Sequence, residues 1–491
     1  MIAKYARGTR HLSKAPSSET LRFFGFLLLA LGSVQPARAQ GVATGGTAVP
    51  ARPLPPGMKA PVVDYRDIAT DSGLVGVNVS GSDTAKQYIV ETTGNGVAIF
   101  DFDNDGLPDI FLVNSGRLDK DAAQPKHFLY HNLGGLKFED VTDKAGIAST
   151  GWGQGVCVGD IDNHGYPDLF ITQWGQNVLY RNLSNGKFRD ETKERGLLSP
   201  KPRWSTGCAF IDFNRDGFLD LVVVHYVDFD LAHTPHPGQT SQCQWKGKPV
   251  MCGPRGLPPE TLSFYQNDGL GNFTDVSDQV HISGPKNYYG FTALTGDFDN
   301  DGWKDLIVAN GHVYPEVDTG HTAEKYKQPR LLYWNRGDGQ FFDLSAQGGP
   351  GMSDAHSSRG LAVGDLDNNG NEEVVIVNMG EAPSLLTNFA TGGNSLLVRA
   401  LTSGRDAIGA RITITADGHK QIDEVRSGGS YISQSDLRLH FGLGKASKAD
   451  ISIRWLDGKV ENLGSVAAGE IVTIDEGRGV IRKQPYSSAK K

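Results

Sequence analysis

Residues 101–110 read DFDNDGLPDI, and the pattern of this stretch returns four more times along the chain. It carries acids at its first, third, fifth and ninth positions and a glycine at its sixth. A hard cation such as calcium needs about six to eight oxygen ligands, and alternate residues of a tight loop can direct several oxygens at one point. The residues after the closing acid are apolar and β-branched, which predicts a strand. We therefore predict a calcium loop between two strands.

A second pattern recurs between these loops: a strand that ends in L-Y-x-N, a glycine-rich turn, and a strand that begins with F-x-D. One unit reads as four short strands, in the order F-x-D, G-x-A/C-x-x-D, D-L-x-V-x-N and L-Y-x-N. Repeated small sheets that cannot bury both faces alone predict an all-β protein, a β-propeller. Five units fill residues 64–390, which favours five blades. Degenerate blades in the longer spacings would raise the number to seven, and a β-helix or open solenoid is the alternative.

The oxygen-bearing residues of the five loops are the candidate calcium ligands. They are Asp101, Asp103, Asp105 and Asp109; Asp160, Asp162 and Asp168; Asp212, Asn214, Asp216 and Asp220; Asp297, Asp299, Asp301 and Asp305; and Asp365, Asp367, Asn369 and Glu373. Asp-Asn-Gly is also ordinary turn chemistry, but five loops in register favour calcium. The second loop has His164 at its fifth position, and imidazole is a poor calcium ligand, so we expect that site to be weaker or completed by water. By charge count, the first and fourth loops rank strongest and the fifth and second weakest.

The N-terminus predicts export from the cytoplasm. Residues 1–39 carry a basic start, an apolar run over 23–34 and an A-x-A motif at 37–39, which together are typical of a secretory signal peptide. An uncleaved membrane anchor is the alternative, but about 12 apolar residues are too few to span a bilayer. Residues 40–63 are rich in Pro, Gly and Ala and predict a flexible linker. We expect a secreted or periplasmic protein without a transmembrane segment in its mature chain.

The formal net charge is −8, and −13 without residues 1–39, which makes nucleic acid an unsuitable partner. Cys243 and Cys252 lie nine residues apart in an insertion over about 228–261, and we expect them to form a disulfide. Cys157 and Cys208 precede the second and third loops at spacings that differ by one residue. This offset puts them on opposite faces of their sheets, so we expect buried free thiols, with a bridge between blades as the alternative.

The C-terminal segment contains RDAIGARITI from Arg405, VRSGGSYISQSDLRLHFGLG from Val425 and IRWLDGKVENL from Ile453. On these motifs it resembles an ASPIC/UnbV domain, and the aspartate loops resemble FG-GAP/VCBS repeats. The combination is similar to the cartilage acidic protein family. The resemblance implies a secreted, calcium-binding propeller over 64–390 with a small β domain over 391–478, and it implies no reaction. We expect a disordered tail over 479–491.

The function that we expect is binding or adhesion to a protein or glycan. Trp152, Trp174, Trp204, Trp245 and Trp303 could line a ligand surface or pack between blades. The alternative is an enzyme with an active site at the central channel near His225 and His312, or a scaffold for a partner enzyme. The chain contains no G-x-S-x-G, Walker A or H-E-x-x-H motif, which favours a protein that is not an enzyme.

Overall fold

A computed structural model describes Gly57 and residues 64–487 with internal gaps, and these residues belong to one compact unit that runs from Ala43 to Lys491. The gaps are residues 83, 119–124, 149–150, 212–215, 217, 254–256, 259, 262, 280–305, 310, 312, 320–324, 336–340 and 390–392. The predicted signal peptide and nearly all of the predicted linker therefore lie outside the described residues. None of the helices within the described ranges is long and apolar enough to cross a membrane.

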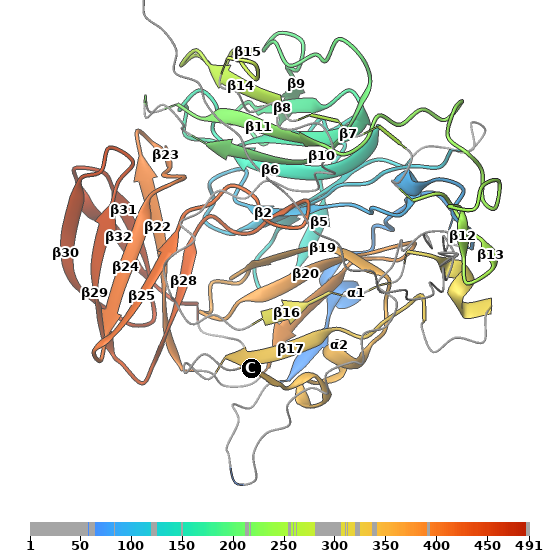
Figure 1. The fold of residues 1–491 in the computed structure, drawn as a ribbon. Helices are drawn as coiled ribbons and strands as arrows, with labels where there is room; N and C mark the ends of the chain where they lie inside the picture. The colour runs from blue at the N-terminus through green and yellow to red at the C-terminus, as the bar shows by residue number, and fades with distance from the viewer. Residues whose placement is uncertain are drawn as a thin grey trace, which may run out of the picture. The chain divides into compact units, whose positions relative to one another are not determined.

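The prediction of an all-β protein is confirmed (Figure 1). The described helices are short: α1 (Ala69–Ser72), α2 (Pro350–Ser353), η1 (Ile89–Glu91), η2 (Pro315–Thr319) and η3 (Ser345–Gln347).

The repeat region forms antiparallel sheets in sequence order. The first holds β2 (Val97–Phe100), β3 (Asp109–Leu112), β4 (Phe128–Asn132) and β5 (Phe138–Asp140). The second holds β6 (Trp152–Gly159), β7 (Asp168–Gly175), β8 (Val178–Asn182) and β9 (Phe188–Asp190). The third holds β10 (Arg203–Ile211), β11 (Asp220–His225), β14 (Ser263–Asn267) and β15 (Phe273–Asp275). The fourth holds β16 (Leu306–Val308), β17 (Leu331–Asn335) and β18 (Phe341–Asp343). The fifth holds β19 (Ser358–Gly364), β20 (Glu373–Asn378), β21 (Ser384–Asn388) and β1 (Tyr65–Asp67).

The F-x-D strand belongs to the sheet before it, which corrects the order of strands that we expected. Each F-x-D strand pairs with the L-Y-x-N strand across the glycine-rich turn, as Phe138 does with Asn132. The G-x-A/C strand therefore begins each sheet. As a result, the first strand of the described chain completes the last sheet, because β1 pairs with β21 through Tyr65 and Asn388. The second and third sheets are also joined, since Trp204 of β10 pairs with Trp174 of β7. The number of blades stays a prediction.

The core lies between neighbouring sheets. In β2 the alternation of side chains directs Val97 and Ile99 toward the fifth sheet, while Ala98 and Phe100 pack against the second. All four residues are buried, because the strand is covered on both faces. This arrangement accounts for strands that are apolar throughout rather than alternating.

Both cysteine pairs form disulfides. The bridge between Cys243 and Cys252 was predicted, and it lies in the insertion that also carries β12 (Gln244–Trp245) and β13 (Lys248–Pro249). The expectation that Cys157 and Cys208 are free thiols is wrong, because their Cα atoms lie 6.0 Å apart and the two are bonded. Adjacent sheets turn opposite faces toward each other, so the offset of one residue brings these cysteines together.

The C-terminal segment forms two facing sheets with a shared apolar core. One sheet holds β22 (Asn394–Thr402), β23 (Arg405–Asp406), β28 (Leu439–Gly444), β31 (Glu470–Asp475) and β32 (Gly479–Pro485). The other holds β24 (Arg411–Ala416), β25 (His419–Glu424), β29 (Lys448–Arg454) and β30 (Val460–Ala467). The predicted disordered tail is wrong as far as Pro485, since β32 pairs with β31 along its whole length. The polar side chains of residues 479–485 gave no strand pattern in the sequence. Their backbone nevertheless forms hydrogen bonds with β31 at the edge of the sheet.

A hairpin of the C-terminal segment lies among the inner strands of the repeat sheets. It consists of β26 (Gly429–Ser430) and β27 (Ser433–Gln434), and Figure 1 shows the orange chain reaching toward β2 and β19. The Ser433 Oγ accepts a hydrogen bond of 3.1 Å from the Val97 backbone N–H. The Ile432 carbonyl oxygen accepts one of 3.3 Å from Val156 of β6. Ile432 is only 3% exposed, so the hairpin is buried among these strands.

Glycine in the G-x-A/C strand makes this close approach possible. A Cβ atom on Gly96 would lie 1.7 Å from the Ile432 carbonyl oxygen. We predict that Gly96→Ala lowers the free energy of unfolding by about 1–3 kcal/mol, because the hairpin has to move outward. Urea denaturation measures the change.

Gly442→Ala is the matched control, because a Cβ there has no neighbour within 4 Å. We expect it to change stability by less than about 0.5 kcal/mol. Equal stability of Gly96→Ala and the parent would contradict the buried position of the hairpin.

Candidate metal sites in the strand-connecting loops

In the first, second and fifth sheets, where the structure describes the aspartate loop in full, this loop connects the first two strands, and its backbone turns through two left-handed residues. In the first loop these are Asn104 and Gly106, with φ of 60° and 92°. The corresponding pairs are Asn163 (55°) and Gly165 (90°), and Asn368 (58°) and Gly370 (88°). Glycine adopts this conformation freely and asparagine more readily than most residues. The recurrent asparagine at the fourth position was therefore a signal of loop geometry that our sequence interpretation did not use.

Backbone donors turn the carboxylates of the first loop inward. Asp101 accepts hydrogen bonds from the N–H groups of Asp105 (3.1 Å) and Gly106 (3.0 Å). As a result, one ligand oxygen from each of Asp101, Asp103 and Asp109 lies within 4.8 Å of the others. Three hard oxygen donors at this spacing fit a divalent cation such as calcium.

In the four loops whose closing acid the structure describes, this acid is buried at the start of a strand and holds two chain segments together. Asp109 accepts from the N–H of Phe102 (3.0 Å) and from that of Asn132 (2.8 Å). The second loop repeats both bonds with Asp168, Ile161 and Asn182, and the third loop repeats the second bond with Asp220 and Asn267. In the fifth loop, Glu373 accepts from the Leu366 N–H and from the Thr387 hydroxyl.

Burial raises the pKa values of the opening and closing acids of the first and fifth loops. It raises the pKa of Asp109 to about 7, that of Asp101 to about 6 and that of Asp365 to about 6. The pKa of Glu373 lies well above its ordinary value for the same reason. Desolvation and repulsion between neighbouring carboxylates both disfavour the charged forms, and a bound cation would offset both effects.

The fifth loop offers the least obstructed set of oxygens among the loops that the structure describes in full. Ligand atoms of Asp365, Asp367 and Glu373 lie within 4.8 Å of one another, and no basic side chain there bonds to these carboxylates. In the first loop, by contrast, His131 Nδ1 lies 3.2 Å from Asp109, and this bond raises the pKa of His131 to about 9. The residues of both loops fit calcium, although His131 would have to yield in the first.

The second loop already contains its own cations. His164 Nδ1 lies 2.9 Å from Asp160 Oδ1 and 2.8 Å from Asp162 Oδ1. These bonds raise the pKa of His164 to about 10, so the imidazole is protonated at neutral pH. Arg181 adds a contact of 2.7 Å to Asp162. Protonated His164 and Arg181 thus compete with calcium for the same carboxylates, and this loop fits the ion poorly.

The remaining predicted ligands are described only in part. Asp216 and Asp220 lie within the described residues, and Asp216 accepts a hydrogen bond of 2.9 Å from the Phe218 N–H. Asp212, Asn214, Asp297, Asp299, Asp301 and Asp305 lie outside them. The structure therefore places no complete ligand set for the third and fourth loops.

Hydrogen bonds join each described loop to the next. Asn368 of the fifth loop donates to the Gly106 carbonyl of the first (2.9 Å), and Asn104 of the first donates to the Gly165 carbonyl of the second (2.7 Å). The asparagine of L-Y-x-N adds another link, since Asn132 donates to the Leu366 carbonyl (2.7 Å). Asn182 and Asn267 repeat it toward Phe102 and Ile161. Neighbouring loops therefore cannot shift independently.

The histidine proposed for catalysis is structural. His225 is 2% exposed, and its two ring nitrogens lie 3.0 Å from the hydroxyls of Ser205 and Ser263. Burial lowers the pKa of His225 well below its ordinary value. His312 lies outside the described residues. Since His225 is buried, its imidazole is closed off from a substrate.

The tryptophans also pack internally. Trp152, Trp174, Trp204 and Trp245 belong to one aromatic cluster with Phe229, and Trp204 is 1% exposed. Trp303 lies outside the described residues. This cluster joins the insertion to the second and third sheets, which favours packing over the alternative of a ligand surface.

Comparison with known proteins identifies two kinds of module. A family model described as "FG-GAP-like repeat" matches residues 101–171, 160–223 and 253–308, and one described as "ASPIC and UnbV" matches residues 400–481. Cartilage acidic protein 1 of Homo sapiens is 25% identical over 395 residues, which cover 78% of this chain and 53% of that protein.

A T-cell immunomodulatory protein homolog of Plasmodium falciparum is 25% identical over 332 residues, which cover 60% of this chain and 44% of that protein. The chain spans about half the length of the curated relatives that it matches. Among solved structures, an Agrocybe aegerita lectin that recognises non-reducing terminal N-acetylglucosamine matches 60% of this chain and 66% of its own. Its 15% identity and TM-score of 0.21 support no argument.

The raised pKa values of the loop acids predict how stability depends on pH. Asp101, Asp109 and Asp365 titrate at about 6–7 in the folded chain and at about 4 when unfolded. Between these values the folded chain binds more protons, so its stability falls as pH rises. We predict that, with a chelator present, these three acids stabilise the folded chain less as the pH rises from about 4 to about 7, which lowers its melting temperature.

Saturating calcium is the control for this prediction. Because the ion binds the deprotonated carboxylates, we expect it to abolish or reverse the decrease. Differential scanning calorimetry across this pH range measures both series. A difference in melting temperature between the calcium and chelator series that does not grow from about pH 4 to about pH 7 would contradict the raised pKa values, since the groups outside the loops affect both series alike.

Proposed function

The chain belongs to the proteins that combine FG-GAP-like repeats with an ASPIC and UnbV domain, and we propose that it is an exported, calcium-stabilised binding module for a protein or glycan. Its two disulfides are typical of proteins outside the cytoplasm. We place the repeat region at 64–390 and the start of the C-terminal domain at 391. Because β32 belongs to this domain, we move its end from residue 478 to Pro485.

The convergent, buried carboxylates of the loops carry the calcium part of the proposal. In the first and fifth loops these acids have raised pKa values, so the folded chain holds them at an energetic cost that a divalent ion would remove. When bound, calcium would neutralise each loop and fix its geometry. The hydrogen bonds between loops would transmit that order to the next sheet.

Two observations favour a binding role over catalysis. The hairpin that carries Ile432 and Ser433 is buried against β2 and β6, the first strands of the first two sheets, and so leaves no space there for a substrate. His225 is buried with both ring nitrogens engaged. The surfaces that remain for partners are the exposed loops, which in repeat folds commonly carry binding residues.

Calcium titration of the chain tests the metal part. We predict heat from several ions and a higher melting temperature, with one fewer ion bound after Asp367→Asn, because this carboxylate belongs to the fifth loop. Isothermal titration calorimetry counts the ions. Asp71→Asn is the control, since Asp71 is exposed in α1, away from the loops.

His164→Asp provides a gain-of-function arm. It removes one of the two cations of this loop, the one that contacts both Asp160 and Asp162, and supplies the missing fifth-position oxygen, so we expect one additional ion although Arg181 stays on Asp162. Titrations that show no heat and no stabilisation in any variant would leave the aspartates as turn formers.

The binding part is tested with the calcium-loaded chain on arrays of glycans and of extracellular proteins. We predict at least one saturable partner whose binding is lost when calcium is chelated, because the loops lose their order. Asp71→Asn should retain this partner and Asp367→Asn should weaken it. A partner that binds equally well without calcium would separate the binding role from the metal.

A further inference from the structure

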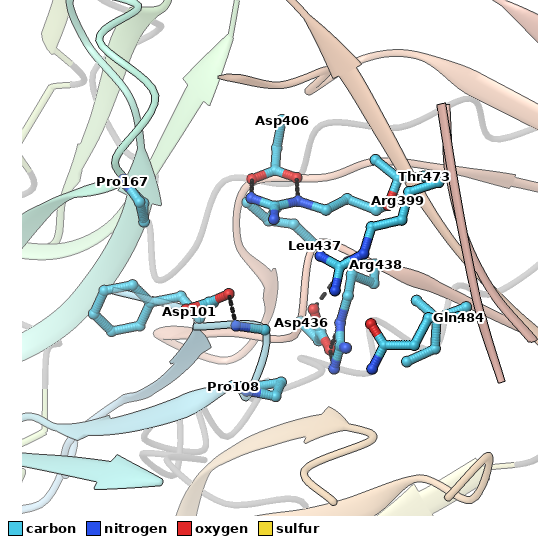
Figure 2. A pocket seen from close by; sticks show the side chains of 14 residues that line it. Asp101, Pro108, Pro167, Arg399, Asp406, Asp436, Leu437, Arg438, Thr473 and Gln484 are labelled. Atoms are coloured by element: carbon cyan, nitrogen blue, oxygen red, sulfur yellow. Dashed lines mark hydrogen bonds and ion pairs between the residues drawn. The ribbon is translucent and has the colours of Figure 1, made fainter. Parts of the chain in front are cut away.

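A pocket lies between the first aspartate loop and the C-terminal sheet that holds β22, β31 and β32 (Figure 2). Its apolar lining residues are Phe100, Pro108, Pro167, Leu437 and Ile471. Its polar lining residues include Thr473 of β31 and Arg482 and Gln484 of β32. A pocket with both apolar and polar lining suits a small organic molecule with one polar end.

Two arginines that line the pocket are already paired. Arg399 makes a two-pronged contact with Asp406, at 2.9 Å and 3.2 Å. Arg438 makes a similar contact with Asp436, at 2.8 Å and 2.6 Å. Figure 2 shows both pairs, with dashed lines between the partners. They make the wall rigid and contribute little net charge.

Three other polar side chains have no such partner. Arg482 and Gln484 lie two residues apart on β32, and Thr473 pairs with Arg482 on β31, so all three share one face of the sheet. They line the pocket. Within the described part of the chain, none of their side chains makes a hydrogen bond or an ion pair. An unpaired guanidinium next to an amide and a hydroxyl is a ready set of donors for an anion.

Asp101 connects this pocket to the first metal loop. Its side chain lines the pocket, and it is also one of the three convergent carboxylates of that loop. Without an ion, the lining charges balance, since Arg399, Arg438 and Arg482 oppose Asp101, Asp406 and Asp436. A cation held by Asp101 would compensate this aspartate, and the pocket would then be positive.

We propose that this pocket binds a small organic carboxylate, with the carboxylate on Arg482 and the apolar part against Phe100 and Pro108. The choice of an anion rests on the proposed calcium site of the first loop, because the ion removes the opposing charge of Asp101. The planar guanidinium of arginine matches a carboxylate, which favours this anion over a neutral ligand.

Benzoate is the probe, and it is titrated into the full chain in excess calcium by isothermal titration calorimetry. We expect a dissociation constant on the order of millimolar for so small a ligand. Arg482→Gln should weaken binding about tenfold or more through loss of the charge-assisted contact. Lys483→Gln is the matched control, since this neighbouring cation is exposed on the opposite face of the strand and should leave binding unchanged.

Benzyl alcohol, which has the ring without the charge, should bind more weakly than benzoate. The absence of benzoate binding to a chain that takes up calcium would overturn the pocket while leaving the proposed function intact. Benzoate binding that Arg482→Gln leaves unchanged would overturn it as well. Benzoate binding that is equally tight in chelator would support the pocket and refute the proposal that calcium compensates the charge of Asp101. A chain that binds no calcium would separately refute the calcium part of the proposed function.

Discussion

The acids that close the first, second, third and fifth loops are each buried at the first residue of a strand, and a buried carboxylate has to be satisfied by donors. Asp109 and Asp168 meet this need in the same way, with one backbone N–H from their own loop and one from the L-Y-x-N strand. The asparagine of that strand then donates to the preceding loop. In these two sheets the buried acid therefore fixes the loop and its strand, and the asparagine next to it fixes the contact with the neighbouring sheet.

The same geometry explains why the strands are apolar on both faces. A sheet that lies between two others has no solvent face, so Val97 and Ala98 are both fully buried although they point in opposite directions. The fifth sheet packs against the first, and β1, from the start of the described chain, completes that fifth sheet by pairing with β21. Glycines such as Gly96 then leave room for the C-terminal hairpin.

The repeat made the all-β fold and its loops predictable, and the short spacing of Cys243 and Cys252 made their disulfide predictable. All of these depend on local patterns in the sequence. Contacts between sheets were not predictable in the same way. The offset that seemed to separate Cys157 from Cys208 brings them together once two sheets face each other. His225 appeared available for chemistry because its serine partners come from other strands. Arg438 of the C-terminal segment contacts Asn368 of the fifth loop, a contact that no local pattern indicates.

The loops show two solutions to one electrostatic problem. Several carboxylates gathered on a tight turn repel one another, and only a positive charge at their centre relieves this repulsion. In the second loop the chain supplies that charge itself: burial raises the pKa of Asp162, yet bonds from His164 and Arg181 lower it to about 2. In the fifth loop no basic side chain bonds to these carboxylates, and burial leaves the pKa of Asp365 raised to about 6 although the charge of Arg438 acts against it. Both loops share one backbone turn, so the difference lies in the side chains around it. His164 stands where the fifth loop has Asn369, and together with Arg181 it gives the second loop cations of its own.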